Sequence, residues 1–515
     1  MITNTETAFF KAQQLFQAMC EFVQKAGEHQ LRVDQVERGL FPQAMQLCLE
    51  LLVDFIDAHG DGDEGEHLAH EGRSLKRLPE PHERRYLSLF GEIFINRSVY
   101  GTREGQAIEW VPLDAALGLP AGENSYVLED WLQRLCVKEA YAESVEDLRA
   151  WLGTTVSVRT AQGMNRKMAA QSEGYRIEQG TPPLDEEAEI LVVTADGKGV
   201  PMRRPLEQRL RDEQQALETA ASSDEELPTQ TPASPPVSRP KTGKAGKKQM
   251  AYVGGVYSIQ PFVRTAEEVI EEVRRNQRAQ DRPEPVHKQL WARMTTIRDG
   301  EAWPGTPLLF IEMARACQAR DPDRQKPLVC LLDGERQLWT MQKEWFPRAV
   351  GILDLFHVLK RLWAVAEAVH PKAPLAAEDF VTHHLRMLLE GKVGYVIRNF
   401  RQWKKKQRSR LRGPAKKQVE AAITYLENNR EHMRYDEYLS AGYPIASGVI
   451  EGACHHFVKD RMEGAGMRWE IEGAQSMLPL RAIYLNGQWD PFIAYRIETE
   501  QTRLYGKIPQ RSVAL

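Results

Sequence analysis

The spacing of apolar positions changes several times along the chain, and each change marks a different predicted element. Residues 5–58 carry apolar side chains at helical spacing, and residues 85–100 alternate well enough for one or two strands. Two runs, 190–195 and 328–332, are apolar at nearly every position, which is typical of strands buried on both faces. Past Asp333 the pattern is helical almost to the end. These patterns predict an α/β fold with a mainly helical N-terminal region.

Residues 126–172 predict short helices that resemble a DNA-binding helix-turn-helix. An amphipathic segment, 143–152, is followed by a Gly-Thr-Thr turn, and Ser157 is placed to cap a second, polar and basic helix. An ordinary helical pair is the alternative interpretation. The candidate DNA contacts on the second helix are Arg159, Gln162, Arg166 and Lys167.

Two further stretches have a distinctive charge pattern. Residues 205–248 begin acidic, continue through Pro, Ser and Thr, and end basic, which predicts a disordered linker. Strand signals resume at 251–259, so this linker is expected to be an insertion in a sheet hairpin.

Residues 398–417 hold ten Lys or Arg and no acid, with Phe400 and Trp403 among them. A solvated face is the default, but the interleaved aromatics favour contact with DNA phosphates. The candidates are Arg401, Lys404, Lys405 and Arg408.

Composition limits the class of protein. A chain of 515 residues is long enough for more than one domain, and 42% apolar with 27% charged residues is the balance of a soluble protein. We find no run of about 18 apolar residues, so no membrane segment is expected. The six cysteines are scattered without a CxxC pair, which favours reduced, cytoplasmic thiols. The net charge of −4 does not by itself favour nucleic acid.

Three carboxylates are the strongest candidates for chemistry. Asp196 and Asp333 each follow a predicted buried strand, and Glu451 lies just past the first turn of a helix that Ser447 is placed to cap. Carboxylates are the ligands that Mg²⁺ prefers, and two such ions hold the attacking and leaving oxygens of a phosphodiester in line. Each residue also has a plainer interpretation. An Asp-Gly pair is usually a turn, and a first-turn Glu interacts favourably with the helix dipole.

Two basic residues follow Glu451 on nearly the same helical face. His455 and Lys459 lie four and eight residues further along the chain. Taken alone, His455 is an ordinary structural histidine. If Glu451 is catalytic, both become candidates for contacting the scissile phosphate.

Several blocks resemble the bacterial insertion-sequence DDE transposases of the ISKra type. The first-Asp and second-Asp motifs of that family are similar to 194–203 and 332–339, and another of its blocks is similar to 352–359. The most distinctive block is 448–469, which contains Glu451, and 112–120 is also similar. The resemblance spans about 85 to 485.

The resemblance implies an RNase H-like catalytic core with an all-helical insertion between the second Asp and the Glu. Asp196, Asp333 and Glu451 would then be the catalytic, metal-binding triad for Mg²⁺, for which Mn²⁺ can substitute. The expected activity is hydrolysis at transposon ends followed by DNA strand transfer. Arg468, in the third block, is a further candidate DNA contact, and His357 is interpreted as supporting rather than metal-binding.

The same resemblance implies a bacterial protein in the cytoplasm, associated with the nucleoid. Its partners would be the terminal inverted repeats and target DNA, with a homodimer or larger assembly on DNA. Two alternatives stay open: a domesticated sequence-specific DNA-binding protein, and an RNase H-like nuclease without strand transfer. The expected regions are 1–125 (helical with a short strand segment), 126–172 (helix-turn-helix), 185–345 (first part of the core), 346–440 (helical insertion), 441–490 (core helix with the third acid) and 491–515 (tail).

Overall fold

The computed structural model describes residues 9–102, 108–203, 248–275, 281–298, 301–406, 413–446, 448, 452–453, 455–464 and 466–506. The chain divides into two compact units. One unit combines residues 1–176 with 488–515, and the other spans 177–487. Each unit is described by itself.

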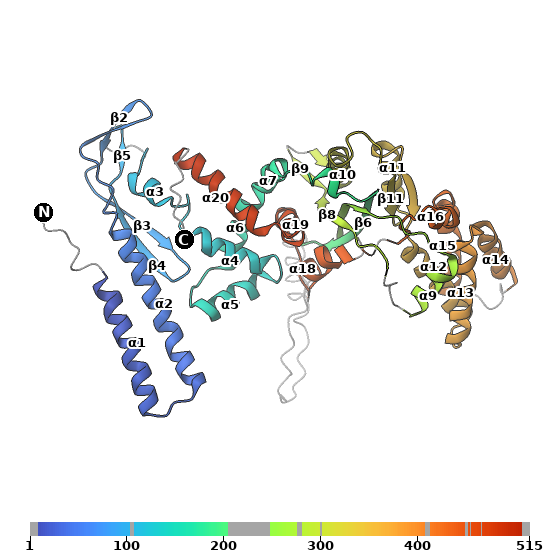
Figure 1. Ribbon diagram of the computed structural model, residues 1–515, viewed down its shortest axis with the longest axis horizontal. Helices are drawn as coiled ribbons and strands as arrows, with labels where there is room; N and C mark the ends of the chain where they lie inside the picture. Colours follow the sequence, from blue (N-terminus) through green and yellow to red (C-terminus); the bar gives the residue numbers. More distant parts are fainter. Residues whose placement is uncertain are drawn as a thin grey trace, which may run out of the picture. The chain divides into compact units, whose positions relative to one another are not determined.

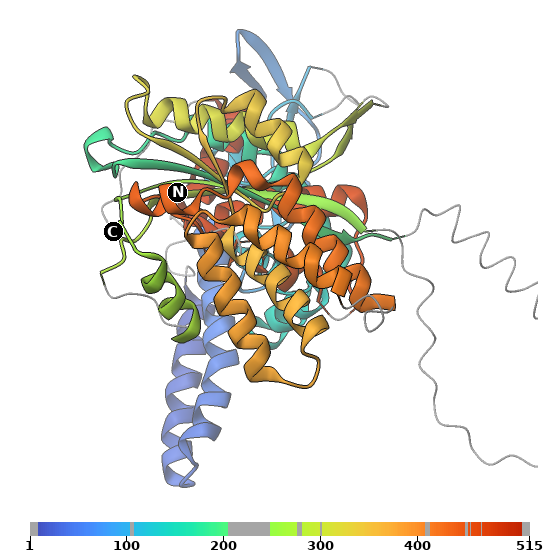
Figure 2. The same cartoon turned by 90° about the vertical axis from the view of Figure 1, so that its right-hand side faces the viewer.

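The first unit begins with a helical hairpin. Helices α1 (Phe10–Glu28) and α2 (Val33–Asp57) lie side by side and run in opposite directions (Figures 1 and 2). Ala12 and Ala26 are buried where α1 meets α2. The helical spacing predicted over residues 5–58 is therefore confirmed for the described residues.

Small antiparallel sheets follow the hairpin. Strands β1 (His67–His70), β2 (Arg73–Arg77) and β5 (Tyr100–Gly101) form one sheet, and β3 (His82–Leu87) pairs with β4 (Glu92–Arg97). Ile56 of α2 packs with Ile93 and Ile95 of β4 and with Leu113 of α3 (Pro112–Leu117). The strands expected within 85–100 are confirmed.

A helical cluster completes this unit. Helices α4 (Tyr126–Cys136), α5 (Tyr141–Leu152) and α6 (Val158–Ala170) share a core of apolar side chains, and α7 (Ser172–Glu178) follows. Segment 491–515, expected to be a tail, contributes most of helix α20 (Trp489–Tyr505). Its buried Arg496 pairs with buried Glu129 of α4, which ties the two ends of this unit together.

A mixed five-stranded sheet forms the centre of the second unit. Its strands are β6 (Ile190–Pro201), β7 (Lys248–Ile259), β8 (Val286–Met294), β11 (Leu328–Leu332) and β12 (Val350–Leu353), in the order β12-β11-β6-β7-β8. β6, β11 and β12 are parallel, whereas β7 runs antiparallel to both β6 and β8. Pro201 pairs with Lys248, so the expected linker does interrupt a sheet hairpin. Residues 204–247 lie outside the described residues.

Helix α10 (Gly305–Arg320) packs against β7 and β8. Gly254 of β7 permits this approach, because a Cβ there would lie 2.7 Å from the sulfur of Met313 and 3.0 Å from Leu309. A buried ion pair between Arg320 and Glu187, 2.6 Å long, fixes the end of α10 near the start of β6. Helices α9 (Ala266–Arg275) and α11 (Arg336–Trp345) and the short strands β9 (Thr296–Arg298) and β10 (Glu301–Trp303) complete this part.

A helical array follows β12. Its members are α12 (Leu355–Val369), α13 (Pro374–Leu389), α14 (Val393–Lys406), α15 (Gly413–Asn428) and α16 (Tyr435–Ser440), and α18 (Asp460–Met462) and α19 (Ile471–Leu485) come after it. For the residues that the structure describes, the expectation of helices past Asp333 is confirmed apart from the strand at 350–353 and a π-helical turn at 455–459. This short strand places the start of the helical array after Leu353 rather than at residue 346.

Helix α2 is long and apolar enough, by length and composition alone, to cross a membrane. Glu50 and Asp54 interrupt its apolar run, and core helices of soluble proteins and signal sequences meet the same criterion, so the absence of a membrane segment stays a prediction. Parts of α2 nevertheless pack within the first unit, where Leu49, Leu52 and Val53 contact its core. The remaining described helices do not meet this criterion.

Candidate functional site

The two predicted aspartates are brought together by the register of the parallel strands. The β6–β11 pairing ends at Ala195 opposite Leu332, so Asp196 and Asp333 are the next residues on the two strands. Asp333 follows its strand, as expected. Asp196 instead lies inside β6, because this strand continues to pair with β7 through Pro201.

The backbone after Asp333 turns sharply away from the sheet. Gly334 has φ +89°, and a Cβ at this position would lie 2.8 Å from Leu353 and 3.0 Å from the Tyr425 hydroxyl. The Glu335 amide donates a 2.8 Å hydrogen bond to Asp333 Oδ1, and the Tyr425 hydroxyl donates one of 2.6 Å to the Asp333 carbonyl. Glycine is therefore required here, and the turn fixes the direction of the Asp333 carboxylate.

A histidine that the sequence analysis had assigned a supporting role joins the two carboxylates. β12 ends at Leu353, and Asp354 caps α12 by accepting a 2.8 Å hydrogen bond from the Phe356 amide. His357 therefore lies in the first turn of α12. Its ring nitrogen and one oxygen each of Asp196 and Asp333 all lie within 4.8 Å of one another. Among the described residues, this is the group placed to hold a metal ion.

The electrostatics of this cluster favour a bound cation. Burial, together with the nearby Asp196 carboxylate, raises the pKa of Asp333 to about 7, although the Glu335 amide opposes this shift. Burial lowers the pKa of His357, but Asp354 and Asp196 outweigh it and the net shift is upward. Nδ1 of His357 lies 3.6 Å from Oδ2 of Asp354, too far for a good hydrogen bond. Negative charge is thus crowded at a site that offers two hard oxygen donors and one nitrogen donor.

Glu335 and Tyr252 also lie at this site, and neither is among the residues predicted from the sequence. The Tyr252 hydroxyl is 3.1 Å from Glu335 Oε1, and the other Glu335 oxygen lies 3.3 Å from where a Cβ on Gly197 would be. Burial and the Glu335 carboxylate raise the pKa of Tyr252 to about 12. Glu335 therefore adds a further carboxylate beside Asp196. The available signal was the closeness of Glu335 to Asp333 in the sequence.

The structure describes the third predicted acid and its neighbours only in part. Glu451 lies outside the described residues. Residues His455–Lys459 form a π-helical turn rather than the regular α-helix that was predicted, and the Lys459 side chain is exposed. This turn contacts β6, the strand that carries Asp196.

The predicted helix-turn-helix forms two helices joined by residues 153–157. The Ser157 side chain accepts a 3.0 Å hydrogen bond from the Thr160 amide, so the predicted N-cap is confirmed. Arg159, Arg166 and Lys167 are exposed on α6, and Gln162 is half-buried. The opposite side of α6 packs into the core with α4 and α5.

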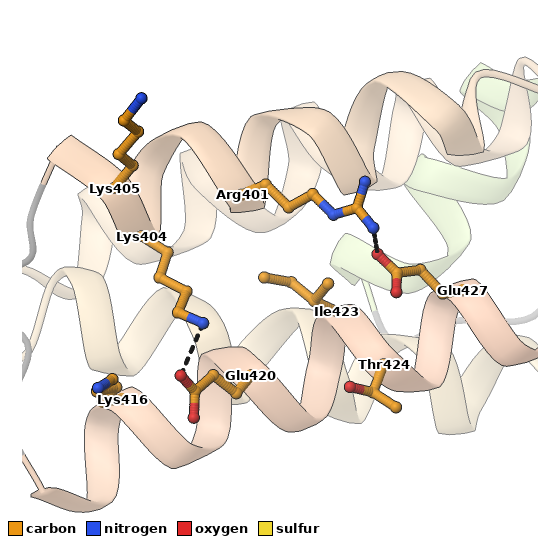
Figure 3. Close-up of a pocket in the computed structure, with 8 residues that line it drawn as sticks. All are labelled: Arg401, Lys404, Lys405, Lys416, Glu420, Ile423, Thr424 and Glu427. Carbon is orange, nitrogen blue, oxygen red and sulfur yellow. Dashed lines mark ion pairs between the residues drawn. The ribbon is translucent and has the colours of Figure 1, made fainter.

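The basic stretch spans α14 and α15 and is less open than its sequence predicts. A groove of about 690 Å³ lies between these helices (Figure 3). Arg401 pairs with Glu427 at 2.5 Å, and Lys404 pairs with Glu420 at 2.7 Å. Lys405 is exposed and points away from the opposite helix.

The aromatic residues of this stretch face the protein instead of solvent. Phe400 is only 1% exposed, and Trp403 is packed against the same core. Phe400 is therefore a packing residue and Trp403 is half-buried, whereas contact of the basic residues of this stretch with DNA phosphates stays a prediction. Arg468 is half-buried, and Arg408 lies outside the described residues.

A scan against protein-family models found no match to this chain, and a search of curated proteins found none either.

Proposed function

We propose that this chain is a DDE transposase that cuts DNA at the ends of an insertion sequence and joins them to target DNA. The observation that carries the proposal is the cluster at the end of the β6–β11 ladder. Two aspartates from separate strands, 137 positions apart in the sequence, converge there with a histidine. Packing alone does not explain carboxylates in this position, because their charges repel each other and burial disfavours them.

The strand order of the second unit supports an RNase H-like core. Three consecutive strands, β6, β7 and β8, are antiparallel, and β11 and β12 are added in parallel on the other side of β6. The first acid lies on the central strand and the second follows its parallel neighbour. Helices α12 to α16 occupy the interval between β12 and Glu451, which agrees with an all-helical insertion.

The cluster fits a divalent cation such as Mg²⁺ or Mn²⁺. Asp196 and Asp333 supply hard oxygen donors, and burial together with the nearby Asp196 carboxylate raises the pKa of Asp333, a cost that a bound cation would relieve. Bound divalent ions would activate the attacking hydroxyl and neutralise charge that develops on the phosphate. His357 offers a nitrogen donor, which Mn²⁺ accepts more readily than Mg²⁺ does. Glu451 is proposed as the third acid.

The residues around the metal ligands orient them. The Glu335 amide and the Gly334 turn fix Asp333, and Asp354 lies behind His357 at the start of α12. Residues that hold a metal ligand in place affect metal affinity nearly as much as the ligands do. Asp354 is therefore proposed as a positioning residue.

Recognition of the element's ends is assigned to α6. Its exposed Arg159, Arg166 and Lys167 lie on the helix that follows the turn of the helix-turn-helix, the position from which such motifs read the major groove. Along α14, Lys405 is the first candidate for a phosphate contact. Arg401 and Lys404 could contact a phosphate only after breaking their ion pairs, Arg401 with Glu427 and Lys404 with Glu420.

A joining assay tests the proposal. A labelled duplex that ends at the terminal repeat of the element is incubated with supercoiled plasmid, wild-type protein and Mg²⁺ or Mn²⁺. A transposase gives labelled plasmid products, and Asp196→Ala, Asp333→Ala and Glu451→Ala variants bind the duplex but give none. Cutting without joining would instead indicate an RNase H-like nuclease. Binding without either reaction, in the wild type, would indicate a sequence-specific DNA-binding protein.

A further inference from the structure

The α1–α2 hairpin has two different sides. On one side the helices contact each other closely. The Phe22 ring lies against Gly39, where a Cβ would be 2.3 Å from the ring, and Lys11 lies 3.9 Å from Glu50. These contacts fix which residues of each helix face the other helix.

Large apolar side chains are exposed elsewhere on the same helices. On α1 and just before it, apolar residues that are 46–60% exposed recur every seven positions; on α2, three more are 42–53% exposed. We call these six residues the outer hairpin face: Phe9, Phe16, Val23, Phe41, Leu51 and Phe55.

Helical geometry places the two sets on one side of the hairpin. Val23 directly follows Phe22, and Leu51 directly follows Glu50, so each is turned by about 100° from a residue that contacts the other helix. Because the two helices run in opposite directions, a step of one residue along either helix, starting from the contact between them, leads to the same side of the hairpin.

On α1, Phe16 and Phe9 lie seven and fourteen residues before Val23 and so nearly in line with it. On α2, Phe55 is turned about 40° and Phe41 about 80° further from α1 than Leu51 is. The outer hairpin face therefore covers one side of the hairpin and continues, at Phe41, round the outer side of α2.

We propose that the outer hairpin face binds the same face of a second copy of this chain, so that two hairpins form a four-helix bundle. On α2 the apolar positions Phe41, Ala44, Cys48, Leu51 and Phe55 alternate in steps of three and four residues. This is the spacing with which a helix packs along another helix. The inference rests on the hairpin alone and does not depend on the proposed function.

The size of the face is sufficient for a dimer. Each of the six side chains is about half exposed. The four phenylalanines would each bury ~100 Å² more when covered, and Val23 and Leu51 about half as much. Two copies together would bury roughly 1,000 Å², about the smallest area of a specific interface.

Charge disfavours a membrane surface as the occupant of this face. Helix α2 carries five acids and a single base; Glu37 and Arg38 lie together at the Phe41 end of the stripe, and Asp54 and Asp57 lie at the Phe55 end. This excess of acid disfavours docking on an anionic membrane surface.

The test is the molar mass of the full-length protein in solution without DNA, measured by light scattering over a range of micromolar concentrations. The wild type is expected to be a dimer. Phe16→Glu should weaken the dimer roughly a hundredfold, because it places a charge at the centre of the interface. Phe10→Glu is the matched control. Phe10 is 55% exposed on the same helix but two residues before the buried Ala12, which turns it to the opposite side of α1.

Circular dichroism first establishes that both variants keep the helical content of the wild type. A monomeric wild type would overturn the proposal, and so would a Phe16→Glu protein that dimerises as well as the Phe10→Glu protein does. Flotation of a monomeric wild type with lipid vesicles would also overturn it, and would assign the face to a membrane. None of these results depends on cleavage or joining of DNA, so failure of this proposal is separate from failure of the proposed function.

Discussion

The crowding of carboxylates at the end of the β6–β11 ladder predicts an unusual response to the substitution Asp333→Asn. Asparagine has nearly the same shape, and its side-chain oxygen still accepts the hydrogen bond that the Glu335 amide donates to Asp333. The substitution therefore removes the charge and leaves the turn unchanged. We expect the variant to be more stable than the metal-free wild type above pH 7.

The sign and size follow from the pKa of Asp333, which is raised from 3.8 to about 7. A carboxyl with a raised pKa holds its proton more tightly in the folded state than in the unfolded state. Its favourable contribution is complete below about pH 4 and is lost as the pH rises to about 7. Three pKa steps at 1.36 kcal/mol each set an upper bound of about 4 kcal/mol, and we expect roughly 2–4 kcal/mol. For a unit of this size that corresponds to a rise in Tm of about 4–8 °C.

The assay is thermal unfolding of chelator-treated wild type and Asp333→Asn at pH 5 and pH 8, with and without Mg²⁺ or Mn²⁺. The advantage of the variant should be large at pH 8 and small at pH 5, and added metal should stabilise the wild type but not the variant. The control is Asp379→Asn, at an exposed carboxylate on α13. It should change neither the pH dependence of the Tm nor the stabilisation by added metal. If Asp333→Asn had no advantage at pH 8, or an equal one at both pH values, the reasoning would be refuted.

Four further predictions concern other parts of the molecule. His357→Ala should lower Mn²⁺ affinity roughly 10–100-fold in calorimetric titration, because it removes the nitrogen donor beside the two aspartates. Arg166→Ala should weaken binding to the terminal repeat and reduce the salt dependence of binding by about one unit of slope, as measured by fluorescence anisotropy. Asn165→Ala, at the adjacent buried position, should lower the free energy of unfolding by about 1–3 kcal/mol, because Asn165 donates a 2.9 Å hydrogen bond inside the helical cluster. Arg320→Ala should lower the free energy of unfolding by roughly 3–5 kcal/mol in urea titration, because it leaves Glu187 buried without its cation.

The two aspartates could be predicted from the sequence, because uninterrupted apolar runs identify strands that are buried on both faces. Parallel strands of that kind end near each other, so the residues that follow them are expected to be neighbours. The predicted neighbours Asp196 and Asp333 do lie together. The same reasoning placed Asp196 at the end of its strand, but pairing with β7 extends β6 by several residues that the apolar pattern alone does not identify.

His357 required the three-dimensional structure. It reaches the cluster because β12 is a four-residue edge strand and Asp354 starts a helix directly after it. A strand this short, with Gly351 inside it, gives almost no periodic signal. Tertiary pairing with β11, rather than local preference, makes it a strand.

In the basic stretch, the spacing of the apolar residues indicates which side chains are buried, whereas the charge pattern does not. Val393, Val396, Ile397 and Phe400 recur at helical intervals and are all buried. This pattern identifies Phe400 as a core residue, because a helix that is basic on one face still buries its apolar face. The charges that remain on α14 are partly satisfied by acids of α15, which lie more than ten residues away in the sequence.

Single-turnover cleavage of a duplex that carries the element's own end, at pH 8 with Mg²⁺, tests the central claim most directly. The account predicts that Asp196→Asn and Asp333→Asn each slow cleavage by roughly a hundredfold or more while the Kd for the duplex stays unchanged. Cleavage at the wild-type rate by either variant would contradict the assignment of these aspartates to the catalytic centre.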